Sequence, residues 1–266
     1  SIGVTVLTLA LIGIVIGLIA GFLSGLLGIG SGVVLVPMLL AVLAAWGEPS
    51  DVIMHHAVLI TLFSMIFITA ASTRAHASRG SVVWPFWRQL VPGMIIGGAI
   101  GAFSSQQLPD VQLQQLFAVF LFWVAWRMLQ PETTAIVPDR TWRWWLGVGL
   151  TVGVLAGLLG LGGGILLVPI LLRRGLTMAV AAGTSVACAL PTVIAGAVMN
   201  GLFFGASVQT HGLGIMDLVL SLSIGLAGII SASWGTAAAH RWSPVYVRRA
   251  FVVLIIVLAV KLLLRS

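Results

Sequence analysis

The chain has 266 residues, of which 60% are hydrophobic and only 7% are charged, and its mean hydropathy is +1.17. Soluble domains carry about 25% charged residues because their surface faces water, so this composition excludes a soluble globular protein and predicts an integral membrane protein. The 13 Lys and Arg residues outnumber the 6 Asp and Glu residues, but they are scattered singly or in pairs, which argues against a nucleic-acid partner. The excess of basic over acidic residues is better explained by the basic loops that membrane proteins carry on the cytoplasmic side of the bilayer.

Hydrophobic runs of about 20 residues mark helices long enough to cross a bilayer. In chain order we expect such helices at 4–27, 53–73, 83–104, 111–129, 143–160, 178–200, 213–239 and 244–264. Two shorter apolar runs, at 33–46 and 165–172, each follow directly on a glycine cluster. The ten pieces form a first membrane repeat at 1–130 and a second at 142–266, and the polar linker at 131–141 contains two prolines and mixed charges.

The two halves share a glycine and proline motif. Residues 21–40 read GFLSGLLGIGSGVVLVPMLL, and residues 153–172 read GVLAGLLGLGGGILLVPILL. Six positions agree at a constant offset of 132 residues, pairing Gly21, Gly25, Gly28, Gly30, Gly32 and Pro37 with Gly153, Gly157, Gly160, Gly162, Gly164 and Pro169. Agreement at residues with special backbone conformations indicates an internal duplication.

Loop charges predict opposite orientations for the two repeats. Arginines lie in segments 74–88, 127–143 and 173–174, which we expect on the cytoplasmic side. The loops at 47–52 and 105–112 contain no Lys or Arg, and we expect them on the outer side. The third helix of the first repeat would then run inward and that of the second repeat outward. An odd number of five pieces in each half is what such an inversion requires.

The segment at 144–173 must leave the cytoplasmic side and return, and two full passes would need about 40 residues. We therefore expect a broken, V-shaped helix pair with its glycine-rich tip part-way across the membrane, and a matching V at 4–46. The predicted fold is an all-α integral membrane protein of two inverted-topology repeats, each of about five helical segments.

Inverted repeats with interrupted helices are typical of secondary transporters, which bind their substrate near the midplane. Each glycine cluster ends one helix and begins the next, so the unpaired N–H groups and the positive dipole end of the new helix point toward the midplane. Two such ends facing each other predict an anion site that needs no Lys or Arg. Its candidate residues are Gly30, Ser31, Gly32, Gly162, Gly163 and Gly164. Close packing of helices is the alternative role, and it is the one we expect for the glycines at 21, 25, 153 and 157.

Hydroxyl and imidazole groups extend the candidate site. Thr184 and Ser185, with Thr61 as counterpart in the first half, can donate hydrogen bonds to an oxyanion, and back-bonding to their own helix is the alternative. His55 and His56 are candidates for proton coupling, and a solvated position at the membrane surface is the alternative. The glycine clusters lack the Lys-Ser/Thr of a phosphate-binding loop, and no catalytic triad or metal-ligand spacing occurs, so we expect no enzyme, metal or cofactor.

The motifs GLLGIGSGVVLVPML and GLLGLGGGILLVPIL resemble the paired signatures of the sulfite exporter TauE/SafE family of bacterial permeases. The likeness covers essentially the whole chain, including Thr184-Ser185 and the loop Ser72-Thr73-Arg74-x-His76-x-x-Arg79-Gly80. It departs from the family pattern at Ile60-Thr61, where Thr-Ser is usual, and at Phe67, where a proline is expected.

This resemblance implies a multi-pass protein of the bacterial cytoplasmic membrane that exports small sulfur-containing anions, such as sulfite or organosulfonates, by alternating access. A passive anion channel of the same architecture is one alternative, which lacks saturable and gradient-coupled flux. A non-transporting membrane scaffold or sensor is the other, although the chain carries no soluble signalling domain to support it.

Overall fold

The computed structural model describes residues 2–28, 30–130, 141–207 and 215–239, and, nearer the C-terminus, residues 249, 252–253, 255–257 and 259–260. Over these residues the fold is all helical, as predicted, with nine helices and no strand. The helices are α1 (Ile2–Leu27), α2 (Gly32–Ala45), α3 (Ile53–Ala77), α4 (Trp84–Ser105), α5 (Asp110–Leu129), α6 (Trp142–Leu159), α7 (Gly164–Leu172), α8 (Met178–Ser207) and α9 (Ile215–Ala239). The predicted piece at 244–264 and the linker at 131–141 lie largely outside the described residues.

Five helices in the described part of the chain combine the length and hydropathy needed to cross a bilayer. Their apolar stretches are Val6–Leu27, Ile53–Ala77, Trp142–Leu159, Met178–Leu202 and Asp217–Ala238. In contrast, α7 has only 9 residues. At 1.5 Å per residue it reaches about 13 Å, which is less than half of a hydrocarbon core of about 30 Å. The chain is therefore a multi-pass membrane protein in which α7 cannot cross alone.

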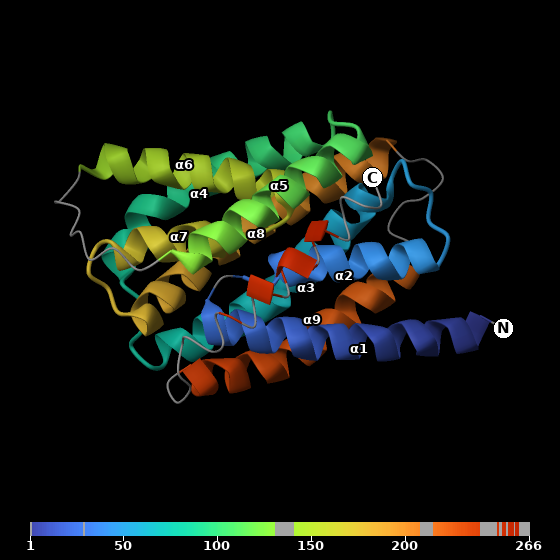
Figure 1. Cartoon of the computed structure of the whole chain (residues 1–266), viewed down its shortest axis with the longest axis horizontal. Coiled ribbons are helices and arrows are strands. Elements are labelled where there is room, and N and C mark those ends of the chain that lie inside the picture. The colour runs from blue at the N-terminus through green and yellow to red at the C-terminus, as the bar shows by residue number, and fades with distance from the viewer. Residues whose placement is uncertain are drawn as a thin grey trace.

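Glycines allow the first helix of each half to lie against the fourth helix of the other half. α1 packs along α9, and α6 packs along α4 (Figure 1). A Cβ atom added to any of three glycines on α6 would meet a backbone oxygen of α4, and the contacts pair Gly149 with Leu90, Gly153 with Met94 and Gly157 with Gly98. Gly17, Gly21 and Gly25 of α1 meet the α9 backbone in the same way. The packing role that we predicted for these motifs is confirmed.

The two ends of the molecule differ in their polar contacts and in the charge of their residues. The start of α3, the end of α4 and the start of α5 meet at one end through His55, Ser105 and Asp110. This is the acidic end, because its connecting segments carry Glu48 and Asp51 and contain no Lys or Arg. At the other end the Arg174 guanidinium lies 5.3 Å from the centre of the Trp145 ring and 5.7 Å from that of Phe86. This is the basic end, and its described arginines include Arg74, Arg79, Arg88, Arg127, Arg143, Arg173 and Arg174.

α3 and α8, the third helices of the two halves, run in opposite directions. Near the start of α8, Thr184 bonds to Val83 in the connection that follows α3. Near the end of α8, Asn200 bonds to Gln106 at the acidic end. This is the direction expected for inverted repeats. The inverted relation of the complete halves and their division at 1–130 and 142–266 stay predictions.

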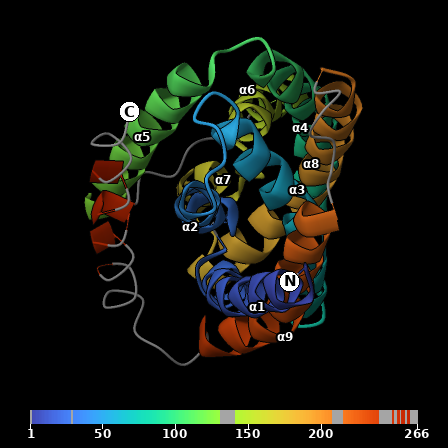
Figure 2. The same ribbon diagram turned by 90° about the vertical axis from the view of Figure 1, so that its right-hand side faces the viewer.

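The α6–α7 pair leaves the basic end and returns to it. Trp145 lies in the first turn of α6 and Arg174 follows α7, and the contact between them brings the two arms of the pair together. Figure 2 shows α2 and α7 in the middle of the molecule, with α3 beside them. The glycine-rich connections before α2 and α7 therefore lie inside the molecule, where both helices begin.

Candidate functional site

The two glycine-rich connections touch each other. We call residues 28–32 the first glycine tip and residues 160–164 the second glycine tip. A Cβ atom on Gly32 would lie 2.8 Å from the Leu161 Cα atom, and one on Gly30 would lie 3.1 Å from the Leu161 carbonyl oxygen. Two segments 132 residues apart in the sequence thus meet backbone to backbone. The prediction that the structure brings the two clusters together is confirmed.

Backbone conformation explains why glycine recurs at the tips. Gly30, Gly160, Gly162 and Gly163 have φ angles of +81°, +71°, +70° and +84°, in the left-handed region that other residues rarely adopt. Ser31 in the first tip has a φ of −77°, so a side chain fits there without strain. A bulky residue at Gly163 would strain the backbone and also meet Met94, Val152 and Ala156, so such a variant cannot separate binding from folding.

One face of α3 contacts both tips. A Cβ atom on Gly160 would lie 3.0 Å from Val58, and one on Gly162 would lie 2.7 Å from the Met65 methyl group, which is also near Gly30. Met65 is the central residue of α3, so the tips meet half-way along this membrane-spanning helix. Thr61 lies between Val58 and Met65 on the same helical face, since residues three and four apart share a face. Its side chain is fully buried.

The equivalent face of α8 contacts the tips from the other side. Ala182 meets Gly28 of the first tip, and Ala189 and Val193 meet Gly162 of the second. Ser185 lies between them and donates a hydrogen bond of 2.6 Å to the Gly164 carbonyl oxygen. Val58, Thr61 and Met65 of α3 correspond to Ala182, Ser185 and Ala189 of α8 at a constant offset of 124 residues. The tips are thus enclosed by matching faces of α3 and α8.

Thr184 contacts a different part of the molecule from the other candidate residues. Its hydroxyl oxygen accepts a hydrogen bond of 2.9 Å from the Val83 N–H, which joins α8 to the connection between α3 and α4. Neither Thr184 nor Ser185 back-bonds to its own helix in the contacts that the structure gives, so the common alternative for such hydroxyls does not account for them. Ser185 faces the tips and Thr184 faces the basic end.

Hydrogen-bond donors without a protein acceptor gather at the tips. The hydroxyl groups of Ser31 and Thr61 are buried and have no hydrogen-bond partner among the described residues. The first N–H groups that the structure pairs with a carbonyl are those of Val34 in α2 and Leu166 in α7, which donate to Ser31 and Gly163. The N–H groups that precede them have no partner within their own helix, as at any helix N-terminus. Chemically, this arrangement suits an oxyanion.

Comparison with known proteins places the chain in a family. Residues 13–262 match the family model described as sulfite exporter TauE/SafE. The chain belongs to this family. A "Probable membrane transporter protein" of Haemophilus influenzae is 28% identical over 250 residues, which cover 90% of this chain and 92% of that protein. A "Probable membrane transporter protein" of Methanocaldococcus jannaschii is 25% identical over 226 residues, or 84% of each chain. No solved structure matches the chain.

The TauE/SafE chain is therefore a membrane transporter, and the family and both relatives' names indicate transport and not an enzymatic activity. Within the part of the chain that the structure describes, no group of three or more His, Cys, Asp or Glu side chains is placed to hold a metal ion. Among the described residues, the buried hydroxyls of Ser31 and Thr61 are the ones without a hydrogen-bond partner that lie at or beside the glycine tips.

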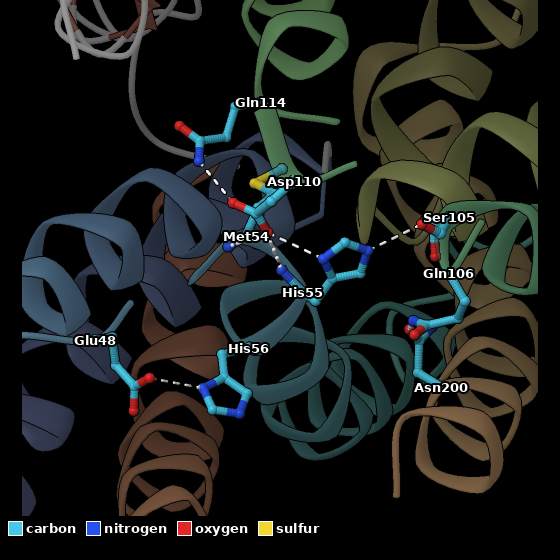
Figure 3. A network of polar contacts seen from close by, with 9 residues as sticks. All are labelled: Glu48, Met54, His55, His56, Ser105, Gln106, Asp110, Gln114 and Asn200. Atoms are coloured by element: carbon cyan, nitrogen blue, oxygen red, sulfur yellow. Dashed lines mark hydrogen bonds and ion pairs between the residues drawn. The ribbon is translucent and has the colours of Figure 1, made fainter. Parts of the chain in front are cut away.

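A second polar cluster lies at the acidic end of the transporter (Figure 3). Oδ1 of Asp110 accepts hydrogen bonds from the backbone N–H groups of Met54 (2.8 Å) and His55 (3.1 Å) and lies 3.0 Å from His55 Nδ1. Oδ2 accepts a 2.7 Å bond from the Gln114 amide. The carboxylate therefore caps the positive N-terminus of α3 from α5.

Both ring nitrogens of His55 have a polar partner in this cluster. Its Nε2 lies 3.0 Å from the Ser105 carbonyl oxygen, which can only accept, so this nitrogen carries a hydrogen atom. Its Nδ1 faces the Asp110 carboxylate, which also only accepts when ionised. The geometry thus fits an imidazolium that joins the negative C-terminal end of α4 to the carboxylate of α5.

Sequence reasoning missed this pair. We expected 105–112 to be an outer loop, but Asp110 is the first residue of α5 and is only 3% exposed. His55 and His56 are also buried, so the solvated alternative for them is wrong. His56 Nδ1 lies 3.4 Å from Glu48 Oε2. The Pro-Asp sequence at the start of an apolar helix was the available signal, because an acid at that place suits a helix N-terminus.

Proposed function

We propose that this transporter moves small sulfur-containing oxyanions, such as sulfite or organosulfonates, and binds them at the paired glycine tips. The observation that carries the proposal is the meeting of two helix N-termini half-way along α3, beside buried hydroxyls that lack a partner. Helix N-termini bind oxyanions through backbone N–H groups and the helix dipole. Substrate residues in this proposal are Gly30, Ser31, Gly32, Thr61, Gly162, Gly163, Gly164 and Ser185, while Thr184 supports the site from the basic end.

We propose export as the direction of transport, on the basis of membrane orientation and membrane potential. Basic loops of membrane proteins lie on the cytoplasmic side, so the basic end faces the cytoplasm of a bacterial cell and the acidic end faces outward. An anion leaving a cell with a negative interior moves down the electrical gradient, worth about 2.3 kcal/mol per charge at 100 mV. Export by alternating access of inverted repeats about the tips is therefore the favoured direction.

Flux into proteoliposomes tests the proposal. Purified protein reconstituted in sealed vesicles should carry sulfite or sulfoacetate with a rate that saturates with concentration, and chloride at equal ionic strength should not compete. Saturation distinguishes a transporter from a passive anion channel of the same architecture. Flux that rises linearly with concentration and is equal for all small anions would support the channel instead, and absence of flux for every sulfur oxyanion would overturn the substrate class.

The Thr61→Val variant distinguishes an effect on anion binding from an effect on folding. Valine has nearly the shape of threonine, and a buried hydroxyl without a partner costs about 1–3 kcal/mol, so the unliganded variant should be at least as stable as the wild type. A hydrogen bond to a charged group contributes about 1.5–3 kcal/mol, so we expect the half-saturating anion concentration to rise about 10- to 100-fold. Saturation curves in proteoliposomes measure the shift.

The matched control is Thr236→Val in α9. Thr236 is equally buried, but its hydroxyl donates to the Ala232 carbonyl oxygen within its own helix. We expect this change to leave the saturation curve in place. Equal curves for Thr61→Val and the wild type would remove Thr61 from the site.

We also propose that a proton accompanies the anion and that His55 and Asp110 bind it. The pair joins α3, α4 and α5 through charge-assisted bonds, and loss of the imidazolium proton would leave an acceptor facing an acceptor. The other ionisable groups in this cluster are His56 and Glu48. Intramembrane ionisable residues in transporters commonly belong to proton relays.

A further inference from the structure

The face of α3 that contacts the tips continues as a polar strip toward the basic end. At 100° per residue, six side chains of α3 fall within a sector of about 80°. We call this set the inner face of α3, and it consists of Val58, Thr61, Met65, Thr69, Ser72 and His76. Three of its six members carry hydroxyl groups and one carries an imidazole ring, in a helix that crosses the bilayer. Polar groups inside a membrane are unfavourable unless they have a role, so their concentration on one buried face of a membrane helix indicates a function.

The inner face lies between two surfaces of α3 that pack against neighbouring long helices, and its last member, His76, also meets Gly183 of α8. On one side of it, Phe67 and Ile68 meet Gly225 and Gly228 of α9. On the other side, Leu62 meets Gly196 of α8. The inner face lies between these two contact surfaces and is directed toward the middle of the molecule, where Val58 and Met65 touch the glycine tips.

The three hydroxyls of the inner face are unpaired, as are the buried hydroxyls of Ser24, Ser31, Thr73 and Ser221 among the described residues. Thr61, Thr69 and Ser72 are at most 2% exposed, and their hydroxyl groups have no hydrogen-bond partner among the described residues. Hydroxyls in membrane helices usually back-bond to the carbonyl four residues earlier. The hydroxyls that do so here include those of Ser64, Thr151, Thr192 and Thr236. The inner-face hydroxyls are thus turned away from their own backbone.

Each buried hydroxyl without a partner lowers the stability of the folded state by about 1–3 kcal/mol. In native proteins such groups commonly have a functional role or bind a water molecule or an ion. At the far end of the strip, His76 is fully buried and its Cβ atom lies 3.0 Å from the position of a Cβ added to Gly183 of α8. His76 is in the last turn of α3, next to the exposed Arg74 at the basic end. The strip therefore connects the glycine tips with the basic end.

We infer that the inner face of α3 is the path of the oxyanion between the glycine tips and the basic end, with the hydroxyls of Thr69 and Ser72 donating hydrogen bonds to it in turn. This inference rests on the proposed function and adds the route to it. Met65 touches both tips and lies between Thr61 and Thr69, so its flexible side chain separates the binding site from the path. All six side chains are buried here, so the path is closed in this structure and opens when the transporter alternates.

Cysteine accessibility tests the path with a matched pair on one helix. Ser72 and Ser64 are both fully buried in α3, but Ser64 bonds to Ile60 and to Ser221 of α9, outside the inner face. Each is changed to cysteine in a Cys188→Ala background, which removes the native thiol. The probe is the membrane-impermeant anion 2-sulfonatoethyl methanethiosulfonate, applied to sealed vesicles with the basic end or the acidic end outward.

We expect Ser72→Cys to react about tenfold faster than Ser64→Cys, only from the basic end, and more slowly when sulfoacetate is present. Position 72 is exposed whenever the transporter opens toward that end, and a minor conformation typically holds about 0.1–10% of the molecules. Position 64 becomes exposed only by local unfolding, which is rarer in a packed helix. Equal rates at the two positions, in a Cys188→Ala protein that retains saturable sulfoacetate flux, would overturn the path and leave the proposed function standing.

A second variant covers the case in which Ser72→Cys fails to fold. Thr69→Val keeps the shape of the side chain and removes one unpaired hydroxyl, so the folded protein should be retained. We expect its maximal sulfoacetate flux to fall at least several-fold, while Thr151→Val on the exposed side of α6 retains the wild-type flux. Wild-type flux through Thr69→Val would contradict the path. Absence of sulfoacetate flux in the wild type itself would instead contradict the proposed function.

Discussion

Gly149→Val should prevent α4 and α6 from assembling and leave little folded transporter. A Cβ atom at this position meets the carbonyl oxygen, carbonyl carbon and Cα of Leu90, all of them backbone atoms. Overpacking costs about 1–3 kcal/mol when side chains can move aside, and a backbone clash exceeds that because the whole helix must shift. The yield of monodisperse protein and its apparent melting temperature in detergent measure the effect.

Gly147 provides the matched control two residues earlier on the same helix. It is exposed, and a Cβ atom added there meets nothing within 4 Å. Gly147→Val should therefore give wild-type yield and melting temperature. If both glycine variants behaved alike, the close α4–α6 contact would not be the feature that the glycines serve.

Asp110→Asn should destabilise the transporter by about 3–5 kcal/mol and change the pH dependence of transport. The carboxylate accepts four hydrogen bonds, two of them from the N-terminus of α3, and faces the His55 ring. Removing one partner of a buried charged pair leaves the other uncompensated, which accounts for the size of the loss. Thermal unfolding and flux measured between about pH 5 and 8, where histidines commonly titrate, test the two effects.

His55→Gln distinguishes a role of His55 in proton binding from a role in stabilising the fold. Glutamine retains donor capacity but does not titrate, so we expect transport that no longer varies with pH over the same range. Asp51→Asn is the control, because Asp51 is exposed in the connection before α3 and an exposed acid contributes little. An unchanged pH profile in His55→Gln would contradict proton binding at this pair and leave it as a structural clamp between three helices.

The helices were predictable from the sequence because hydrophobic run length is a direct consequence of bilayer thickness. Boundaries were less accurate where polar residues are buried. α3 continues to Ala77, four residues beyond the expected end, because Ser72 and His76 are buried, with His76 against Gly183 of α8. α8 likewise continues past Asn200, whose amide bonds to Gly196 within the helix and to Gln106, the residue after α4.

The meeting of the glycine tips was also predictable, since duplicated helix breaks in opposite repeats place two N-termini at one depth. The partners of individual side chains were not. Asp110 and His55 lie 55 residues apart, and only the packing of α5 against α3 makes them neighbours. Thr184 and Ser185 are adjacent in sequence, yet their 100° separation on α8 sends one to the basic end and the other to the tips.

The account predicts that the glycine tips bind a sulfur oxyanion, and thermal stabilisation of the detergent-purified protein tests this most directly. A ligand that binds only the folded state raises its stability by about 2.7 kcal/mol at one hundred times its Kd. Sulfite, sulfoacetate, thiosulfate, sulfate, taurine and acetate are compared at equal ionic strength with chloride. We expect selective stabilisation by sulfite or a sulfonate that is lost in Thr61→Val and retained in Thr236→Val. Stabilisation that is equal in the two variants, or equal for chloride and the sulfur anions, would contradict binding at the tips.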